Sequence, residues 1–266
     1  MSELVFLKFG GSLITDKDQA HTPRLDVIRR LAEEVAQART QSPDLRILLG
    51  HGSGSFGHTP ARRYNTRAGV STPAGWSGFA EVWAEARALN QIVVEALVAA
   101  GLPVIAFPPS AWVVAQDGSA LEWNAAPIRL ALAAGLLPLV NGDVVFDQTR
   151  GGTILSTEDI FTALAPELRP SRVLMSGIEP GVWVDFPACT QVLEHLTAAG
   201  FAALGAGLAG SASVDVTGGM RQKVELMLRL ARQVEGLEAS IFSGREPGLV
   251  RSALCGAAAG TRITYA

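Results

Sequence analysis

The stretch Leu4-Val5-Phe6-Leu7-Lys8-Phe9-Gly10-Gly11-Ser12 joins a short apolar run to a pair of glycines. A run of this length and composition is typical of a buried β-strand. Glycine lets the backbone approach a ligand closely because it carries no side chain beyond its hydrogen. The sequence therefore places Lys8 at the end of a first strand, beside a tight glycine loop.

Two further glycine-rich segments follow the same pattern. An apolar run from Arg46 leads into the segment Gly50 to His58, in which four of the first eight residues are glycine. Backbone N–H groups in such a loop can form a nest for anionic oxygens. Near the other end, Asp215 to Lys223 contains two glycines ahead of an apolar-periodic helix, whose N-terminus favours negative charge.

Lysine is nearly absent from the chain. Of the 22 basic residues, only Lys8, Lys17 and Lys223 are lysines, and each lies inside or beside a glycine-rich segment. A lysine ammonium acts on phosphate as a compact point charge, whereas an arginine guanidinium is a wide, planar clamp. The three positions therefore indicate a phosphate site, with composition bias as the simpler alternative.

Composition limits the classes of protein that the chain can belong to. It has 266 residues, 48% of them apolar, and a formal net charge of −3. That supports a packed core, and the lack of a basic stripe argues against nucleic acid as a partner. Two cysteines and no signal-peptide pattern predict a cytoplasmic protein. Prolines interrupt the longest uncharged stretch, 96–116, so we expect no membrane span.

Strand and helix patterns alternate along the chain and predict an α/β fold with a largely parallel central sheet, covered on both faces. In such sheets ligands bind beyond the carboxyl ends of the strands. A soft boundary near residue 170 divides an N-terminal acceptor-substrate lobe, 1–170, from a C-terminal nucleotide-binding lobe, 171–266, over one continuous sheet. We expect helices at 23–40, 78–100, 124–134 and 157–168, strands near residues 104, 137–140, 173, 182, 241 and 263, and a hairpin over 141–155.

The segment Gly52 to Gly57 also matches the dinucleotide-binding pattern G-x-G-x-x-G. It follows the second strand rather than the first, however, and Pro60, Arg62 and Arg63 stand where that pattern needs an apolar start to the helix. A P-loop is excluded because the chain has no G-x-x-x-x-G-K-[ST] segment.

Four patches together resemble the amino acid kinase family: Lys8 to Ser12, Gly52 to His58, Asn141-Gly142-Asp143, and Thr217-Gly218-Gly219-Met220 with Lys223. The resemblance covers nearly the whole chain and implies a three-layer αβα sandwich. Within the family, Ser55-Phe56-Gly57-His58 and Ile14-Thr15-Asp16-Lys17 resemble the isopentenyl phosphate kinase branch, a relative of the fosfomycin-resistance kinase.

The resemblance implies a phosphotransferase that moves the γ-phosphoryl group of ATP, with Mg²⁺, to isopentenyl phosphate. By analogy, Lys8 and Lys223 neutralise the transferring group, and Lys17 supports the transition state. His58 then holds the acceptor phosphate, and Asp143 organises two lysines by ion pairing. His58 and Asp143 also have plainer readings, as a solvated loop histidine and as a hairpin-stabilising residue. Relatives commonly form homodimers through the N-terminal lobe, so we expect a homodimer.

The same resemblance assigns two sets of binding residues. The nucleotide set comprises Gly10, Gly11, Ser12, Gly54, Thr217, Gly218 and Gly219. The acceptor set comprises Gly52, Ser53, Gly57, His58 and Thr157. An apolar tail also needs an apolar pocket, and Phe79 and Trp83, four residues apart on one helix, together with Val145 and Ile154 on the hairpin, are its candidate walls. Core packing explains the two aromatic residues nearly as well.

Two departures from the family pattern leave details open. Gly177-Ile178-Glu179-Pro180-Gly181 replaces an acidic turn near the nucleotide, and Thr157 stands where the branch usually has glycine. Two alternatives therefore remain: a kinase for a phosphonate of the fosfomycin type, and a non-catalytic nucleotide-binding sensor of the same fold.

Overall fold

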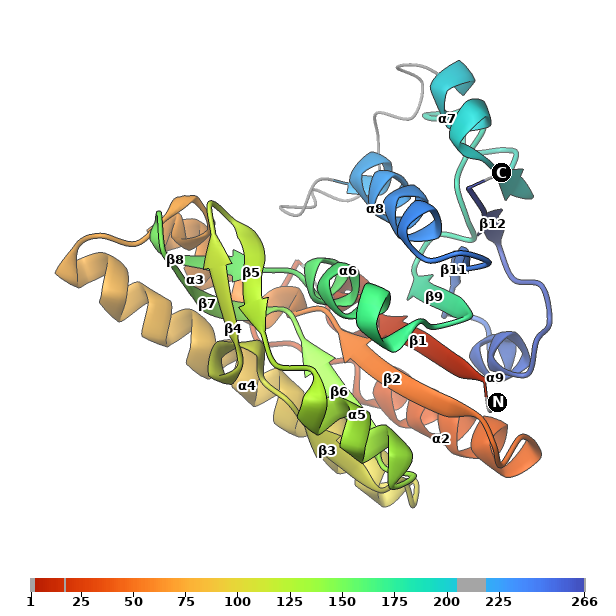
Figure 1. Ribbon diagram of the computed structural model, residues 1–266, viewed down its shortest axis with the longest axis horizontal. Helices are drawn as coiled ribbons and strands as arrows, with labels where there is room; N and C mark the ends of the chain where they lie inside the picture. Colours follow the sequence, from red (N-terminus) through yellow and green to blue (C-terminus); the bar gives the residue numbers. More distant parts are fainter. Residues whose placement is uncertain (1–2, 17, 205–218, 266) are drawn as a thin grey trace.

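A computed structural model describes residues 3–16, 18–204 and 219–265 of the chain. Its main sheet contains the following strands: β1 (Leu4–Phe9), β2 (Arg46–His51), β3 (Val104–Ala106), β6 (Leu137–Asn141), β9 (Arg172–Gly177), β10 (His195–Leu196), β11 (Glu238–Ser243) and β12 (Thr261–Ile263). Their order across the sheet is β10-β12-β11-β9-β1-β2-β6-β3 (Figure 1). Among these described strands, β11 and β12 form the antiparallel pair, and the other neighbours are parallel. The predicted α/β fold class is confirmed.

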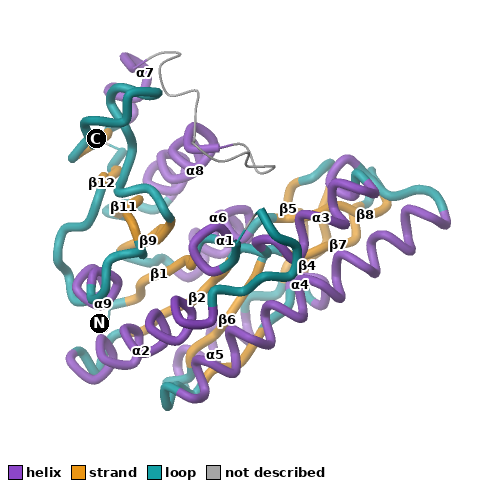
Figure 2. Tube along the Cα trace, turned by 180° about the vertical axis from the view of Figure 1, so that it is seen from behind, coloured by secondary structure: helices purple, strands orange, loops and turns teal. Residues whose placement is uncertain are grey.

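Helices cover both faces of this sheet, as the views from opposite sides show (Figures 1 and 2). They are α1 (Gly11–Ile14), α2 (Leu25–Gln41), α3 (Gly54–Tyr64), α4 (Pro73–Ala99), α5 (Ala126–Ala133), α6 (Thr157–Leu168), α7 (Ala198–Leu204), α8 (Gly219–Gln233) and α9 (Leu249–Leu254), with the 3₁₀ turns η1 (Thr66–Ala68) and η2 (Pro109–Ala111). Side chains of α5, α6 and α8 share one core cluster, and those of α2, α4 and α9 share a second. The sheet is therefore the middle layer of three.

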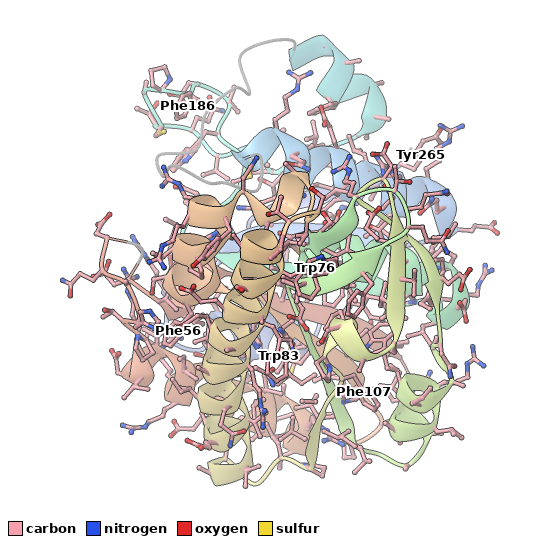
Figure 3. The ribbon with its side chains drawn as sticks, turned by 90° about the vertical axis from the view of Figure 1, so that its left-hand side faces the viewer. Phe56, Trp76, Trp83, Phe107, Phe186 and Tyr265 are labelled. Atoms are coloured by element: carbon pink, nitrogen blue, oxygen red, sulfur yellow. The ribbon has the colours of Figure 1, made fainter. Side chains whose placement is uncertain are left out.

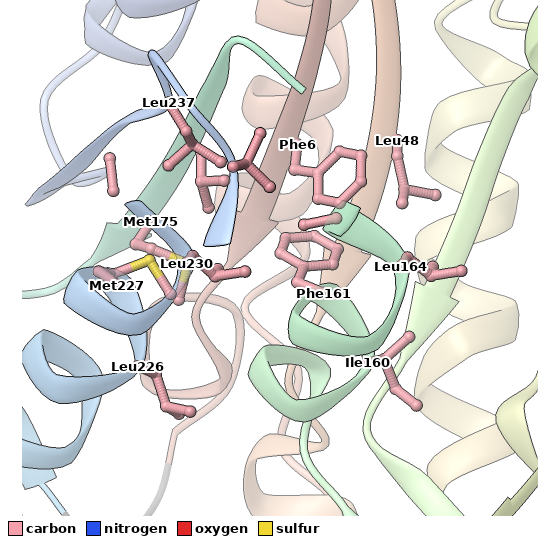
Figure 4. Close-up of a cluster of buried hydrophobic side chains, with 14 of the residues drawn as sticks. Phe6, Leu48, Ile160, Phe161, Leu164, Met175, Leu226, Met227, Leu230 and Leu237 are labelled. Atoms are coloured by element: carbon pink, nitrogen blue, oxygen red, sulfur yellow. The ribbon is translucent and has the colours of Figure 1, made fainter. Parts of the chain in front are cut away.

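Strand β1 shows why its apolar run is continuous rather than alternating. All six of its residues are buried, because helices pack on both sides of the strand. Leu4 and Phe6 belong to the cluster of α6 and α8, where the rings of Phe6 and Phe161 lie 5.0 Å apart (Figure 4). Lys8 is the next residue on that face, so its side chain emerges where the core ends and α6 begins.

A smaller sheet lies beside the main one, in the order β5-β4-β7-β8. Its strands are β4 (Val113–Gln116), β5 (Ser119–Trp123), β7 (Asp143–Asp147) and β8 (Gly151–Leu155). The predicted hairpin is present and spans 143–155, with Asp143 opposite Leu155. The capping box of Ser156 and Asp159 then starts α6. The β4–β5 hairpin was not predicted, since its residues carry no strict alternation.

Three local predictions need correction. Helix α3 begins at Gly54 and continues past Pro60, so His58 lies on a helix rather than in a loop. Helix α4 begins at Pro73, a turn before the expected start. Val182 lies in no strand, and an isolated bridge joins Trp183 to Val192 nearby. None of the described helices is both long and apolar enough to cross a membrane.

Candidate active site

A cavity of about 300 Å³ lies where the carboxyl ends of β1, β2 and β9 meet the first residues of four helices. Its walls include Gly11 of α1, Gly54 of α3, Thr157 of α6 and Met220 of α8. The first turn of a helix exposes N–H groups that have no partner within the helix, and its dipole favours anions. Four such ends around one cavity make a site suited to a polyanion.

The glycine loops after β1 and β2 are packed against each other. A Cβ atom on Gly11 would lie 2.7 Å from the Gly54 nitrogen, and one on Gly52 would lie 2.9 Å from the Gly11 nitrogen. No larger residue fits at either position without moving the backbone. The two loops therefore bring their N–H groups to one wall of the cavity. Gly10, Ser12, Ser53 and Gly57, also predicted to bind ligand, lie on the same wall.

Lys8 and Glu158 form a buried ion pair at the floor of the cavity. The Lys8 ammonium donates a hydrogen bond to Glu158 Oε1, and the two residues are 7% and 4% exposed. Burial raises the pKa of Glu158, but the charges of Lys8 and Lys223 and the Lys8 hydrogen bond outweigh it, so the pKa lies below its usual value. Glu158 is therefore ionised at neutral pH.

Lys223 lies on the first turns of α8 and lines the same cavity as Lys8. Its charge also lowers the pKa of Glu158, which places both ammonium groups within electrostatic reach of one carboxylate. The sequence predicted that the two lysines converge, and the structure brings them together. The other predicted members of this group, Lys17, Thr217 and Gly218, lie outside the described residues, and Gly219 begins α8.

Asp143 lines the cavity, but the carboxylate that contacts Lys8 is Glu158, so the predicted pairing of Asp143 with Lys8 is corrected. Asp143 accepts hydrogen bonds from the backbone N–H groups of Ser110, at 3.3 Å, and Val144, at 2.8 Å. Burial raises its pKa to about 6, and those hydrogen bonds hold it from rising further. Sequence reasoning missed Glu158 because it lies 150 residues from Lys8 along the chain, whereas Asp143 lies in a motif that resembles the family's.

His58 lies on the face of α3 that borders the cavity, together with Gly57 and Ala61. Residues 57, 58, 61 and 62 share this face because they lie three to four positions apart on a helix. Arg62 and Arg67 also line this end, and Arg67 lies 3.7 Å from Asp159 of α6. Neither arginine was predicted, since arginine is common in this chain and neither lies in a glycine motif.

Beyond His58 the cavity becomes apolar, with walls from Ala61, Val82, Ala86 and Ile154. Ile154 was predicted here, and it pairs across the hairpin with Val144.

Three of the predicted walls do not line the cavity. Phe79 packs in a small core cluster with Val82 and Val144, next to the cavity wall. Trp83 is 37% exposed on the outer side of α4, with Arg87 above its ring (Figure 3). Val145 packs in the main core, on the strand face opposite Val144. For Trp83 a shift of one residue on the helix decided the case, because Val82 lines the cavity in its place.

His51 joins four elements behind the cavity. Its ring lies 3.1 Å from the Gly52 carbonyl and 3.0 Å from Asn90 Oδ1 of α4, and its backbone carbonyl accepts hydrogen bonds from Thr157 Oγ1 and Gly142 N. Burial lowers the pKa of His51, so the ring is neutral. The histidine is structural, and it fixes both the glycine loop and the start of α6.

Comparison with known proteins places this site in a family. The model of the amino acid kinase family matches residues 3–243. The chain belongs to the amino acid kinase family. It is 33% identical to the isopentenyl phosphate kinase of Methanothermobacter thermautotrophicus and 30% identical to that of Methanocaldococcus jannaschii, each over 98% of this chain and 99% of the relative. A solved structure of isopentenyl phosphate kinase superposes with a TM-score of 0.82 at 29% identity, over 98% of this chain and 100% of the other.

These comparisons confirm the family and the phosphotransferase class that the motifs predicted. Membership of a kinase family also implies that ATP is the phosphoryl donor. In the amino acid kinase fold of this chain, the family's glycine motifs are the two loops that meet at Gly11 and Gly54.

Proposed function

We propose that this protein catalyses the ATP-dependent phosphorylation of isopentenyl phosphate to isopentenyl diphosphate. The observation that carries the proposal is one cavity with two ends of different chemistry. Lys8, Lys223 and four helix N-termini surround its polar part, whereas Val82, Ala86 and Ile154 line the part beyond His58. A phosphate monoester with a short apolar tail matches both ends. Relatives that cover nearly the whole chain are named isopentenyl phosphate kinase.

The reaction brings two polyanions together, and cations must offset their repulsion. Two unit charges 4 Å apart repel by about 4 kcal/mol at an effective dielectric of 20. In this proposal Lys8 and Lys223 neutralise the transferring phosphoryl group, as does Lys17 of the predicted set. Glu158 holds the Lys8 ammonium in place before substrate arrives, so that little reorganisation is needed during transfer.

No general base is required of the protein. The second pKa of a phosphate monoester is about 6, so the acceptor is mostly dianionic at neutral pH. In-line positioning and charge stabilisation then supply the catalysis. In this proposal His58, which lines the cavity, donates a hydrogen bond to the acceptor phosphate. Thr157 has its hydroxyl turned to the His51 carbonyl, and its role is to shape the acceptor end.

Mg²⁺ is proposed to accompany the nucleotide. The described residues contain no cluster of three or more histidine, cysteine, aspartate or glutamate side chains that could hold a metal ion. Mg²⁺ commonly keeps several waters and binds through phosphate oxygens, so this donor set fits a metal that arrives with ATP. When bound, the ion supplies positive charge to the phosphates, and the lysines supply the rest.

The division of labour between lobes is also part of the proposal. Residues 1–170 provide His58 and the apolar end, for the acceptor, and 171–266 provide Lys223 and the turn after β9, for the nucleotide. β1 lies between β9 and β2, so both lobes share one sheet and meet at Lys8. We place the reaction in the cytoplasm.

A homodimer is proposed through the free edge of the main sheet. β3 ends the sheet on the side of the N-terminal lobe. Ile105 on this strand is 41% exposed, Val98 of α4 is 58% exposed and Leu130 of α5 is 70% exposed. An apolar edge of this kind is usually covered by another chain.

A product assay tests the proposed reaction. Purified protein is incubated with ATP, Mg²⁺ and, separately, isopentenyl phosphate, dimethylallyl phosphate, fosfomycin, acetylglutamate or UMP. We expect turnover on the prenyl phosphates. Faster turnover on fosfomycin would favour the phosphonate kinase, and nucleotide binding without turnover on any acceptor would favour the sensor.

A further inference from the structure

Arg67 brings to the cavity a guanidinium that the proposed reaction does not use. It lies on the turn η1, between α3 and α4, and its side chain is 35% exposed. It belongs to none of the four patches that carry the family resemblance. A charged side chain that is largely covered needs a partner, in the protein or in a ligand.

The backbone and the side chain of Arg67 are both held in place. Its carbonyl accepts hydrogen bonds from Thr153 Oγ1 of β8, at 2.9 Å, and from Arg150 Nη1, at 3.4 Å. Its own Nη2 lies 3.7 Å from Asp159 Oδ2 of α6. These contacts join η1 to β8 and α6, and they direct the guanidinium toward the first turn of α6.

Asp159 orients Arg67 without occupying its hydrogen-bond donors. A separation of 3.7 Å is too long for a hydrogen bond. The same Oδ2 accepts shorter bonds within the capping box, from Ser156 N at 2.8 Å and from Ser156 Oγ at 2.7 Å. Of the two residues, only Arg67 is among the described residues that line the cavity. The guanidinium can therefore donate to a group bound there.

The carboxylates that line this end of the cavity already have partners. Glu158 accepts a hydrogen bond from Lys8, and Asp143 accepts two from the backbone N–H groups of Ser110 and Val144. The first turn of α6 exposes N–H groups and the positive end of the helix dipole, so it too favours an anion. The partner that suits Arg67 is therefore an oxyanion of a ligand.

The chemistry of the cation indicates which oxyanion. A lysine ammonium is a point charge that suits a group in motion, whereas a guanidinium presents a fixed, planar fork that suits phosphate held in one place. The transferred phosphoryl group moves, and in the proposed reaction Lys8 and Lys223 neutralise it. The phosphate that the acceptor already carries stays in place. Arg67 also contacts β8 and α6 of the N-terminal lobe, whereas Lys223 lies on α8.

We propose that Arg67, positioned by Asp159, binds the phosphate that the acceptor carries before the reaction. Arg67 is then a specificity-determining residue that favours acceptors with an oxyanion at this point. The inference rests on the proposed function, and it adds to the predicted acceptor set a residue from outside the glycine motifs.

Acceptor binding and steady-state kinetics together test the inference. Isothermal titration calorimetry measures Kd for isopentenyl phosphate and, separately, for ATP, and a product assay gives KM and kcat. The variants are Arg67→Met, which keeps the aliphatic stem, Arg67→Lys, which keeps the charge, and Asp159→Asn, which keeps the guanidinium. The control is Arg63→Ala, because Arg63 lies on α3 and pairs with Glu81 at 3.0 Å but is not among the described residues that line the cavity.

We expect Arg67→Met to raise Kd and KM for isopentenyl phosphate about tenfold to a hundredfold, the loss typical of hydrogen bonds to a charged group. Its kcat and its Kd for ATP should stay near wild type, because a contact to a group that is not transferred is made equally before and during the reaction. Arg67→Lys should lose less than Arg67→Met, since it lacks only the fork. Asp159→Asn should also lose less, and Arg63→Ala should match wild type.

Three results would overturn the inference. The first is an unchanged Kd for isopentenyl phosphate in Arg67→Met. The second is an equal loss for isopentenyl phosphate and ATP, and the third is an equal loss in Arg67→Met and Asp159→Asn, since both would indicate a structural ion pair only. Melting temperatures identify a variant that has failed to fold, and Arg67→Lys then serves in place of Arg67→Met, with a wild-type Kd as the contrary result.

Failure of the proposed function can be told apart from failure of this inference. If wild type binds isopentenyl phosphate but does not phosphorylate it, the proposed function fails, while the ratio of Kd values between Arg67→Met and wild type still tests Arg67. If wild type does not bind isopentenyl phosphate at all, both fail together.

Discussion

Replacing Glu158 by glutamine removes one charge from a buried ion pair and leaves the other. Lys8 is 7% exposed and Glu158 is 4% exposed, so water cannot solvate the remaining ammonium well. Breaking a buried pair by removing one partner costs about 3–5 kcal/mol. We expect Glu158→Gln to lose that much free energy of unfolding at pH 7, measured by urea denaturation.

A surface pair provides the matched control for this variant. Arg63 and Glu81 lie 3.0 Å apart with both side chains solvated. Exposed pairs of this kind contribute about 0–1 kcal/mol, so Glu81→Gln should leave the free energy of unfolding almost unchanged.

The pH dependence of the loss identifies the group responsible. The pKa of Glu158 is lowered in the folded protein from its usual value of 4.5, so the folded state binds fewer protons there than the unfolded state. The stabilisation is complete above the unfolded value and disappears as the pH falls through the folded value. The difference between wild type and Glu158→Gln should therefore be constant from pH 8 to 5 and shrink below about 4.5.

Activity should fall along with stability, because the Lys8 ammonium would no longer be fixed at the cavity floor. Loss of one preorganised charged group typically costs about 10²–10³ in kcat. The reasoning would be refuted if Glu158→Gln were as stable as wild type at pH 7, or if its kcat for isopentenyl phosphate were within threefold of wild type, on the order of the scatter of such measurements.

The remaining predictions concern one residue each. Asp143→Asn should gain up to about 3 kcal/mol of stability above pH 6, because the rise of the Asp143 pKa from 3.8 to about 6 means that folding opposes its ionisation. That gain should vanish below pH 3.8, where the wild-type residue is protonated in both states, and a gain at every pH measured by urea denaturation would contradict this cause. Lys223→Arg should lower kcat by about 10² at an intact ATP affinity, since a planar guanidinium cannot take the place of a point charge. Near-wild-type turnover would contradict the point-charge argument. His58→Ala should raise the KM for isopentenyl phosphate about tenfold, with the Kd for ATP unchanged; an equal loss for both ligands would place the histidine elsewhere. Gly11→Ala should destabilise by about 1–3 kcal/mol in thermal or urea unfolding, because its methyl group would lie 2.7 Å from the Gly54 nitrogen, and a neutral result would show that the loops can separate.

Much of this protein follows from local sequence. The run at Leu4 to Phe9 predicted a buried strand, and the glycines after it predicted a tight loop that a ligand can approach closely, because both depend on the residues themselves. The scarcity of lysine selected Lys8 and Lys223, and the fold brings both to one cavity.

Other features depend on distance in the sequence or on a single step of register. Glu158 meets Lys8 across 150 residues, because α6 packs on the face of β1 that carries Phe6 and Lys8. Val82 rather than Trp83 faces the cavity, because one residue on a helix turns the side chain by about 100°. The sequence by itself determined the alternating α/β order, the buried first strand, and the glycine loops that carry Lys8 and His58. Only the tertiary structure decided which charges pair and which apolar side chains face the ligand, because those contacts depend on how helices dock on the sheet.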